Sequence, residues 1–253
     1  MAELSVVTFN THYGLRPLRG HAVAYDLGAV LEDLAADAMV IQEVWRPDGA
    51  RGVVDEFAES HGYTMHHVVI GRATVRRRWP HHHPDGEGTI GTAVLTRVAA
   101  ERRPDVVVGP TFGDPAPRRE VVHVVVEGDD DASQLDVMGV HLTSRLPHGP
   151  PLQLRRLAAA LPPRGRATLV AGDCNFWGPP VSALLGDGWR RAVTGRTWPA
   201  RRPHSQSDHV LLRPRDVRVL DAAIGPDVGS DHRPLRLRVA WPVSPSDPQR
   251  GSA

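Results

Sequence analysis

The stretch GSDHRPLRLRVA, Gly229 to Ala240, joins a polar cluster to a strand-like run. From residue 235 onward, leucine and valine alternate with arginine, which is typical of a strand that buries one face. The acid Asp231 and the imidazole of His232 stand side by side just before that run, and neither side chain helps a core. Because successive side chains of an extended chain point in different directions, these two groups can serve different parts of one site.

Runs of β-branched and apolar residues recur along the chain, and several of them alternate as a half-buried sheet does. We expect strands at residues 4–9, 38–44, 65–70, 91–97, 105–109, 119–127, 135–142, 167–173, 207–212, 216–224 and 234–240. Helical patterns are fewer, and they fit residues 21–36, 50–60, 152–161 and 180–186. Two stretches rich in proline, glycine and charge, residues 76–88 and 109–118, are expected to be loops.

The excess of strands over helices indicates two sheets packed on each other. We therefore predict an α/β (α+β) fold, a four-layer α/β sandwich in which two mostly antiparallel β-sheets pack face to face with helices outside. A chain of 253 residues with 41% hydrophobic content can bury such a core within one domain. We assign residues 1–241 to that domain and expect residues 242–253 to form a disordered tail.

Composition narrows the class of protein only in part. The formal net charge of +1 indicates neither strong attraction to nucleic acid nor the absence of a local basic patch. One cysteine, Cys174, excludes an intramolecular disulfide, argues against a thiolate metal cluster and fits a reducing compartment. The N-terminus lacks a basic segment followed by an apolar run, and no stretch approaches membrane-spanning length. We expect a soluble, cytoplasmic protein.

Acid, amide and imidazole groups stand where the expected strands begin or end. Strand ends and the loops that follow them are where rigid scaffolds place reactive groups. The residues at these positions are Asn10, Glu43, His141, Asp173, Asn175, Asp208, Asp231 and His232. Their number suggests that they share one site.

Each of these residues also has a purely structural interpretation. Asp173 and Asn175 could form a turn or cap the helix expected near Pro180, and His141 could be a core histidine. Glu43 follows the apolar run AMVI, so a buried Glu43 needs a metal ion or an arginine as its partner. The joint occurrence of these groups in this order favours a site.

The motifs FNTHYG, IQEVW, GTAVLTR, GVHL, GDCN, SDHVLL and GSDHRP, taken together and in this order, support a family assignment. The series resembles the endonuclease/exonuclease/phosphatase superfamily, the deoxyribonuclease-I-like metal-dependent phosphoesterases. The resemblance runs from about Ser5 to Val239, which is nearly the whole chain.

The resemblance implies a divalent-cation site with Glu43 as the acidic ligand, Asn10 beside it and Asp231 on the opposite side. The implied ion is Mg²⁺, with Mn²⁺ as a possible substitute, and hard oxygen donors suit either ion. Asn10 is also a candidate substrate-binding residue. Cys174, at the variable place of the GDCN motif, is interpreted as a small packing residue.

The resemblance also implies the catalytic residues. Asp173 and Asn175 match the pair that positions the attacking water and the scissile phosphate. His232 matches the histidine that faces the phosphate, and Asp208 matches the carboxylate that orients it. His141 matches the second site histidine. Either Asp173 or His232 could be the general base, because that choice depends on geometry and coupled pKa values.

Three further features carry weaker hypotheses. Arg119, in RREVVHVVV, resembles a segment in which an arginine approaches the substrate phosphate, although an arginine entering a strand is usually a solvated edge residue. Glu87 is a candidate for orienting His141. The basic loop at residues 76–88 could face substrate, with Trp79 stacking on a base or contacting a lipid headgroup, or could be a plain surface loop.

The favoured function is Mg²⁺-dependent hydrolysis of phosphate esters by a phosphodiesterase, with DNA or RNA as the substrate. A phospholipid or sphingomyelin-type substrate and a small phosphorylated metabolite remain alternatives. A noncatalytic phosphate-binding module and a zinc hydrolase rank lower, the latter because the histidines lack an HExxH pattern. No protein partner can be inferred.

Overall fold

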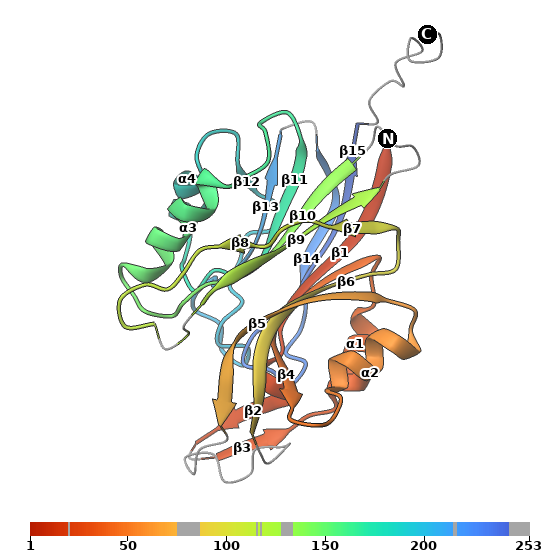
Figure 1. The fold of residues 1–253 in the computed structure, drawn as a ribbon, viewed down its shortest axis with the longest axis vertical. Helices are drawn as coiled ribbons and strands as arrows, with labels where there is room; N and C mark the ends of the chain where they lie inside the picture. The colour runs from red at the N-terminus through yellow and green to blue at the C-terminus, as the bar shows by residue number, and fades with distance from the viewer. Residues whose placement is uncertain are drawn as a thin grey trace.

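Two β-sheets packed face to face form the centre of the computed structural model, which describes residues 1–19, 21–74, 87–114, 116, 118–127, 134–214 and 217–242 (Figure 1). The first sheet has the strand order β14 (Arg218–Ile224), β15 (Leu235–Trp241), β1 (Ala2–Asn10), β4 (Ala38–Pro47), β6 (Glu87–Thr96) and β5 (Thr64–Thr74). The second has the order β12 (Arg190–Arg191), β13 (Asp208–Arg213), β11 (Ala167–Asp173), β10 (Gln134–His141), β9 (Glu120–Glu127) and β7 (Ala100–Arg102), with β8 (Val106–Val107) also paired to β9.

The packing of apolar side chains explains the layers. One buried cluster joins inward-facing residues of both sheets, for example Val6 and Val40 from the first with Val137 and Leu169 from the second. A second cluster lies between the first sheet and the helices α1 (Leu27–Leu34) and α2 (Val53–Ser60). A third lies between the second sheet and the helices α3 (Gly149–Ala159) and α4 (Pro180–Leu185). The predicted four-layer sandwich is confirmed (Figure 1).

The strand pairing brings the polar strand ends to one edge of the molecule. β1 runs parallel to β4, and β10 runs parallel to β11, so the carboxyl ends of each pair lie together. The neighbouring strand β13 is antiparallel to β11 and begins at that same edge, with Asp208 opposite Asp173. The other pairings within these two sheets are antiparallel.

The first predicted helix begins later than the sequence pattern indicates. Residues His21–Ala24 form β3, which pairs with β2 (Leu15–Leu18) in a small separate sheet. The helix begins at Leu27 because the Asp26 carboxylate accepts a hydrogen bond from the backbone N–H of Ala29, which is a helix N-cap. The prediction of one helix over residues 21–36 is therefore wrong at its start.

Other predicted boundaries also shift. The strand expected at residues 91–97 begins at Glu87, so the loop expected at residues 76–88 is wrong at its end. α3 begins at Gly149, three residues before the predicted start at residue 152, because proline is tolerated in the first turn of a helix. The rest of the basic loop, with Trp79, lies at residues 75–86, outside the described part of the chain, as do residues 243–253 of the predicted tail. No helix in the described ranges is long and apolar enough to cross a membrane.

A buried charge network joins β9, β10 and the start of β11. The carboxylate of Asp136, a residue only 2% exposed, accepts hydrogen bonds from His123 Nε2 at 2.7 Å and from Arg166 Nε at 2.7 Å. Burial alone would raise the pKa of Asp136, but the two donors outweigh burial and hold that pKa below its ordinary value. The ionised carboxylate therefore stabilises the folded state.

We predict that Asp136→Asn lowers the free energy of unfolding by about 2 kcal/mol at pH 7, the usual scale for hydrogen bonds to a charged group. Because the folded-state pKa is depressed, this contribution is complete above the unfolded value of about 3.9 and is lost as the pH falls through the folded value. Urea unfolding from pH 7 to pH 3 should show the gap between wild type and variant closing. The exposed pair of Glu3 with Arg238 supplies the control, since Glu3→Gln should change stability by less than about 1 kcal/mol. An equal loss in both variants would contradict the prediction.

Candidate active site

The second sheet aligns three of the predicted residues side by side. His141 ends β10, Asp173 ends β11 and Asp208 begins β13, and the register pairs His141 with Asp173 and Asp173 with Asp208. All three residues are buried. This alignment follows from strand pairing alone, because each residue occupies the same level of the sheet.

The first sheet contributes Asn10 at the end of β1 and Glu43 from within β4, which continues to Pro47 beyond the strand end predicted at residue 44. A β-bulge interrupts β4 between Gln42 and Val44, where it pairs with β6. The bulged residue is Glu43. Its φ of 54° lies in the left-handed region, which residues other than glycine rarely adopt. Such backbone strain costs on the order of 1–3 kcal/mol and is typical of functional sites. The bulge therefore points the Glu43 side chain in a direction that regular strand pairing would not give it.

Asn10 joins the two sheets. Its Nδ2 donates to Glu43 Oε1 at 3.2 Å and to Asp173 Oδ2 at 3.1 Å. Its Oδ1 accepts the backbone N–H of His12 at 3.0 Å. One buried amide thus fixes a carboxylate from each sheet, and its bond to Asp173 spans 163 positions of the chain.

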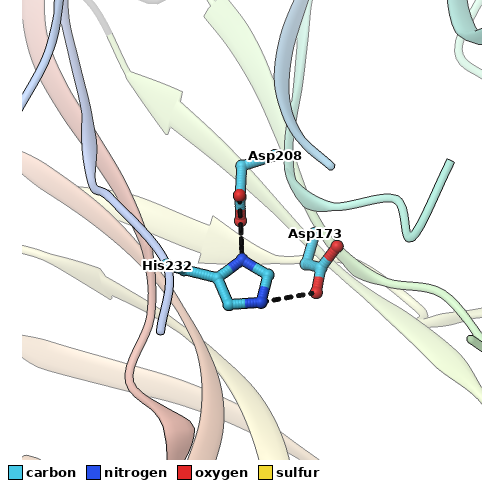
Figure 2. A group of neighbouring side chains, drawn as sticks. All are labelled: Asp173, Asp208 and His232. Atoms are coloured by element: carbon cyan, nitrogen blue, oxygen red, sulfur yellow. Dashed lines mark hydrogen bonds and ion pairs between the residues drawn. The ribbon is translucent and has the colours of Figure 1, made fainter. Parts of the chain in front are cut away.

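His232 lies between two carboxylates from the second sheet (Figure 2). Its Nδ1 donates to Asp208 Oδ2 at 2.9 Å, and its Nε2 lies 3.8 Å from Asp173 Oδ2. Burial would lower the pKa of His232, but the charges of Asp208 and Asp173 outweigh burial and raise that pKa well above its ordinary value. The imidazole is therefore a cation at neutral pH.

Asp208 and Asp173 respond differently to the same imidazolium. Burial would raise the pKa of Asp208, but the His232 charge and its hydrogen bond hold that pKa below its ordinary value. Burial raises the pKa of Asp173 to about 7, although the His232 charge opposes the shift. The protein thus holds one ionised carboxylate against the histidine and a second whose protonation changes near neutral pH.

The GDCN segment forms a tight turn. Asp173 Oδ1 accepts the backbone N–H of Asn175 at 2.8 Å, and Asn175 has a left-handed φ of 47°. The Asn175 Nδ2 donates to the carbonyl of Leu142 at 2.9 Å. The structural alternative is correct in that Asp173 stabilises a turn, but neither residue caps α4, whose N-cap is Pro179. Cys174 between them is fully buried in the apolar cluster beneath α3 and α4, and burial raises the pKa of its thiol.

His141 faces the carboxylates of both sheets. Its Nε2 lies 3.8 Å from Glu43 Oε1 and 4.0 Å from Asp173 Oδ2. Burial and the nearby charge of Arg119 lower the pKa of His141 well below its ordinary value, so this imidazole is neutral. Its Nδ1 has no hydrogen-bond partner within the described residues. The prediction that Glu87 orients His141 is therefore wrong, because Glu87 is exposed and pairs with Arg72.

Arg119 contacts both the backbone of His141 and the loop residue Asp114. Its guanidinium forms an ion pair with the buried Asp114, with 2.7 Å from Nε to Oδ2, and its Nη1 donates to the backbone carbonyl of His141 at 3.0 Å. The side chain is 9% exposed and lines the cavity, so it is not a solvated edge residue. Its charge is already shared with Asp114, which limits what it offers to a substrate phosphate.

Asp231 lies close to His232 and Trp198. Its Oδ1 is 3.9 Å from His232 Nε2, and its Oδ2 accepts the indole N–H of Trp198 at 3.2 Å. The hydroxyl of Ser230, the preceding residue, donates to the backbone carbonyl of Asn10 at 2.7 Å. That bond ties the turn before β15 to the end of β1.

Sequence reasoning missed three residues of the site. His12 and Tyr13 line the cavity on a left-handed turn, with φ values of 44° and 57°. The charge of Glu43, together with burial, raises the pKa of Tyr13. Glycine after two bulky residues in THYG was the available signal for such a turn. Trp198 belongs to an irregular loop, and no pattern in the sequence links it to Asp231.

The cluster opens into a cavity of about 800 Å³. Its lining includes the polar residues of the cluster. It also includes an apolar and aromatic group, called here the apolar wall, formed by Ile70, Ile90, Leu146, Phe176, Trp177 and Trp198. A cavity of this size with a few convergent polar groups is typical of a site that binds a small molecule.

Glu43, Asn10 and Asp231 fit a divalent cation. Glu43 Oε2 is buried and has no hydrogen-bond partner among the described residues, which is costly for a carboxylate unless a cation completes it. Asn10 and Asp231 add oxygen donors of the type that Mg²⁺ prefers. Asp173, Asp208 and His232 also lie within 4.8 Å of one another through their ligand atoms. In that second group the Asp208–His232 hydrogen bond already satisfies both partners, so Glu43 is the stronger ligand candidate.

Comparison with known proteins identifies the family of the chain. The sequence profile of the Endonuclease/Exonuclease/phosphatase family matches residues 7–232. No curated protein matches the chain in a sequence search.

Solved structures share the fold. A protein described as an endonuclease/exonuclease/phosphatase from Beutenbergia cavernae has a TM-score of 0.69 at 20% identity, with 95% of this chain and 72% of that chain covered. Bacteroides thetaiotaomicron mannosyl-6-phosphatase has a TM-score of 0.67 at 12% identity, with 94% and 100% covered. TDP2 from D. rerio, complexed with a single-strand DNA product, has a TM-score of 0.61 at 16% identity, with 95% and 100% covered. The profile match spans every catalytic and metal-binding residue predicted from the sequence, and the chain belongs to the endonuclease/exonuclease/phosphatase family.

Proposed function

We propose that this chain is a Mg²⁺-dependent phosphodiesterase that hydrolyses nucleic acid. The observation that carries the proposal is the bond pattern of Asn10, which holds Glu43 from one sheet and Asp173 from the other against His232 in one buried cluster. Structural roles alone do not explain why acid, amide and imidazole groups gather around a cavity of about 800 Å³.

The cation site consists of Glu43, Asn10 and Asp231. Mg²⁺ bound there would neutralise charge on the nonbridging phosphate oxygens and stabilise the leaving oxygen. The charge of Glu43 matters most, because its buried Oε2 has no other partner among the described residues. Mn²⁺ has the same preference for oxygen ligands and serves as a substitute.

The remaining residues act on the phosphate and the water. His232, a cation held by Asp208, stabilises the negative charge that develops on the phosphate in the transition state. Asp173 orients the attacking water and accepts its proton, because a cationic His232 has no free nitrogen lone pair. Asn175 uses one amide hydrogen for Leu142 and keeps the other for a phosphate oxygen. His141, neutral and aimed at the same carboxylates, hydrogen-bonds the substrate.

Nucleic acid is the favoured substrate because of the apolar wall. Trp177 is 53% exposed and Trp198 is 37% exposed, and both line the cavity beside the catalytic cluster. A flat base can stack on such rings, which contributes about 1–3 kcal/mol per base. Within the described residues, Arg72 and Arg119 are the arginines that line the cavity, and both are paired with carboxylates, so we expect stacking on the tryptophans to contribute more to recognition than these two charges do.

We predict that turnover of bis-nitrophenyl phosphate requires Mg²⁺, is abolished by EDTA, and falls on the order of 100-fold or more in His232→Ala. The variant loses a transition-state cation, so its kcat should fall. His66→Asn is the matched control, because His66 is a buried histidine that does not line the cavity and its loss should leave turnover within about 3-fold. Full activity in His232→Ala would show that the site is wrongly assigned, and no turnover in wild type under any metal condition would favour a noncatalytic binder.

Glu43→Gln keeps the shape of the side chain and removes its charge. We expect the Mg²⁺ concentration for half-maximal turnover to rise at least about 10-fold, with the fold unchanged by circular dichroism. The control is Glu3→Gln, which changes an exposed glutamate of the same sheet. An unchanged Mg²⁺ requirement would exclude Glu43 as a ligand.

A substrate panel tests the nucleic-acid assignment. Plasmid DNA, RNA, sphingomyelin, inositol phosphates and nucleotides would be incubated with wild type and His232→Ala in parallel. We expect DNA or RNA to be cleaved faster than the other substrates, and cleavage to disappear in the variant. Faster turnover of a lipid or a small metabolite would replace nucleic acid as the substrate and leave the phosphoesterase assignment intact.

A further inference from the structure

Trp198 lies in a loop that is fastened to the Asp231–His232 segment. The loop closes on itself, because Trp198 exchanges backbone hydrogen bonds with Ser205, each of 3.0 Å. The backbone N–H of Ala200 donates to the carbonyl of Asp231 at 2.7 Å, and Arg233 donates to the carbonyl of Thr197 at 3.0 Å. The loop and the segment that carries the two site residues thus behave as one unit.

The indole of Trp198 makes a specific bond to the site. Its Nε1 donates to Asp231 Oδ2 at 3.2 Å, while its ring lines the cavity and meets His204 edge-on, with 5.2 Å between ring centroids. The ring is therefore held on one side by His204 and on its N–H edge by Asp231. An indole N–H is a donor only, so this bond is directed at an acceptor.

Asp231 has limited support from elsewhere. Its side chain is 21% exposed, more than the 2–3% of Asp173 and Asp208. Its Oδ1 lies 3.4 Å from the Ser230 hydroxyl, whose hydrogen is donated to the Asn10 carbonyl, and 3.9 Å from His232 Nε2. A carboxylate on an exposed turn loses rotamer freedom when it binds an ion, and a donor that fixes its rotamer beforehand reduces that cost.

From these contacts we infer that Trp198 is a positioning residue for the cation site, in which the indole N–H holds the Asp231 carboxylate in the orientation that binds the divalent ion. The inference rests on the proposed function, because it assumes that Asp231 is a ligand. Trp198 touches no ion itself. It acts as the outer hydrogen-bond partner of a ligand, and loss of such partners typically weakens metal affinity 10–100-fold.

The test uses Trp198→Phe, which keeps an aromatic ring in the cavity and removes only the N–H. Mn²⁺ binding would be measured without substrate, by isothermal titration calorimetry and electron paramagnetic resonance. We expect the dissociation constant for Mn²⁺ to rise about 10-fold. Trp177→Phe is the control, since Trp177 lines the same cavity and has no bond to Asp231; its ion affinity should not change.

A double-mutant comparison shows whether the effect passes through Asp231. In an Asp231→Ala background, Trp198→Phe should cause no further loss of Mn²⁺ affinity, because the acceptor of the indole bond is gone. In the wild-type protein, the Nε1–H resonance of Trp198 should shift when Mg²⁺ is added. That measurement needs no variant, so it still decides the matter if Trp198→Phe does not fold.

Three results would overturn the inference. They are an unchanged Mn²⁺ affinity in Trp198→Phe, an equal loss of Mn²⁺ affinity when Trp198→Phe is made in the Asp231→Ala background, and a Trp198 Nε1–H resonance that does not shift when Mg²⁺ is added. Failure of the proposed function would look different. In that case the wild-type protein itself would neither bind Mn²⁺ nor turn over a phosphodiester in its presence.

Discussion

A single amide holds the candidate active site together. Asn10 donates to a carboxylate of each sheet, and it can do so only because β1 lies where the two sheets bring their strand ends to one edge. The apolar cluster between the sheets fixes their separation, and the strand registers fix the level of each polar residue. The chemistry at that edge therefore depends on packing far from it. A change in the core that moved one sheet against the other would separate Glu43 from Asp173.

Periodicity and strand-end chemistry were enough to predict most of the architecture. Alternating runs such as LRLRV identify strands because burial of one face leaves a period of two in the sequence. The polar residue at the end of a strand is then placed by register, as His141, Asp173 and Asp208 are. Such positions can be predicted because a local rule determines them.

Features that depend on tertiary context could not be predicted from the sequence. The bulge at Glu43 and the left-handed turn at Tyr13 aim side chains through backbone angles that no periodicity encodes. Arg119 is buried behind His141 because Asp114 neutralises it, and that partner comes from a loop without regular structure. The helix at Leu27 starts late because a capping aspartate and a short strand compete with the helical pattern.

The burial of Cys174 has a practical consequence. Its thiol lies beneath α3 and α4, between two residues of the candidate active site, and burial keeps it in the unreactive protonated form. A maleimide or an oxidant can reach it only when that helical layer lifts from the sheet. Labelling of this thiol in native buffer would therefore follow local opening around the GDCN turn, and mild oxidation would leave the candidate active site unmodified at Cys174.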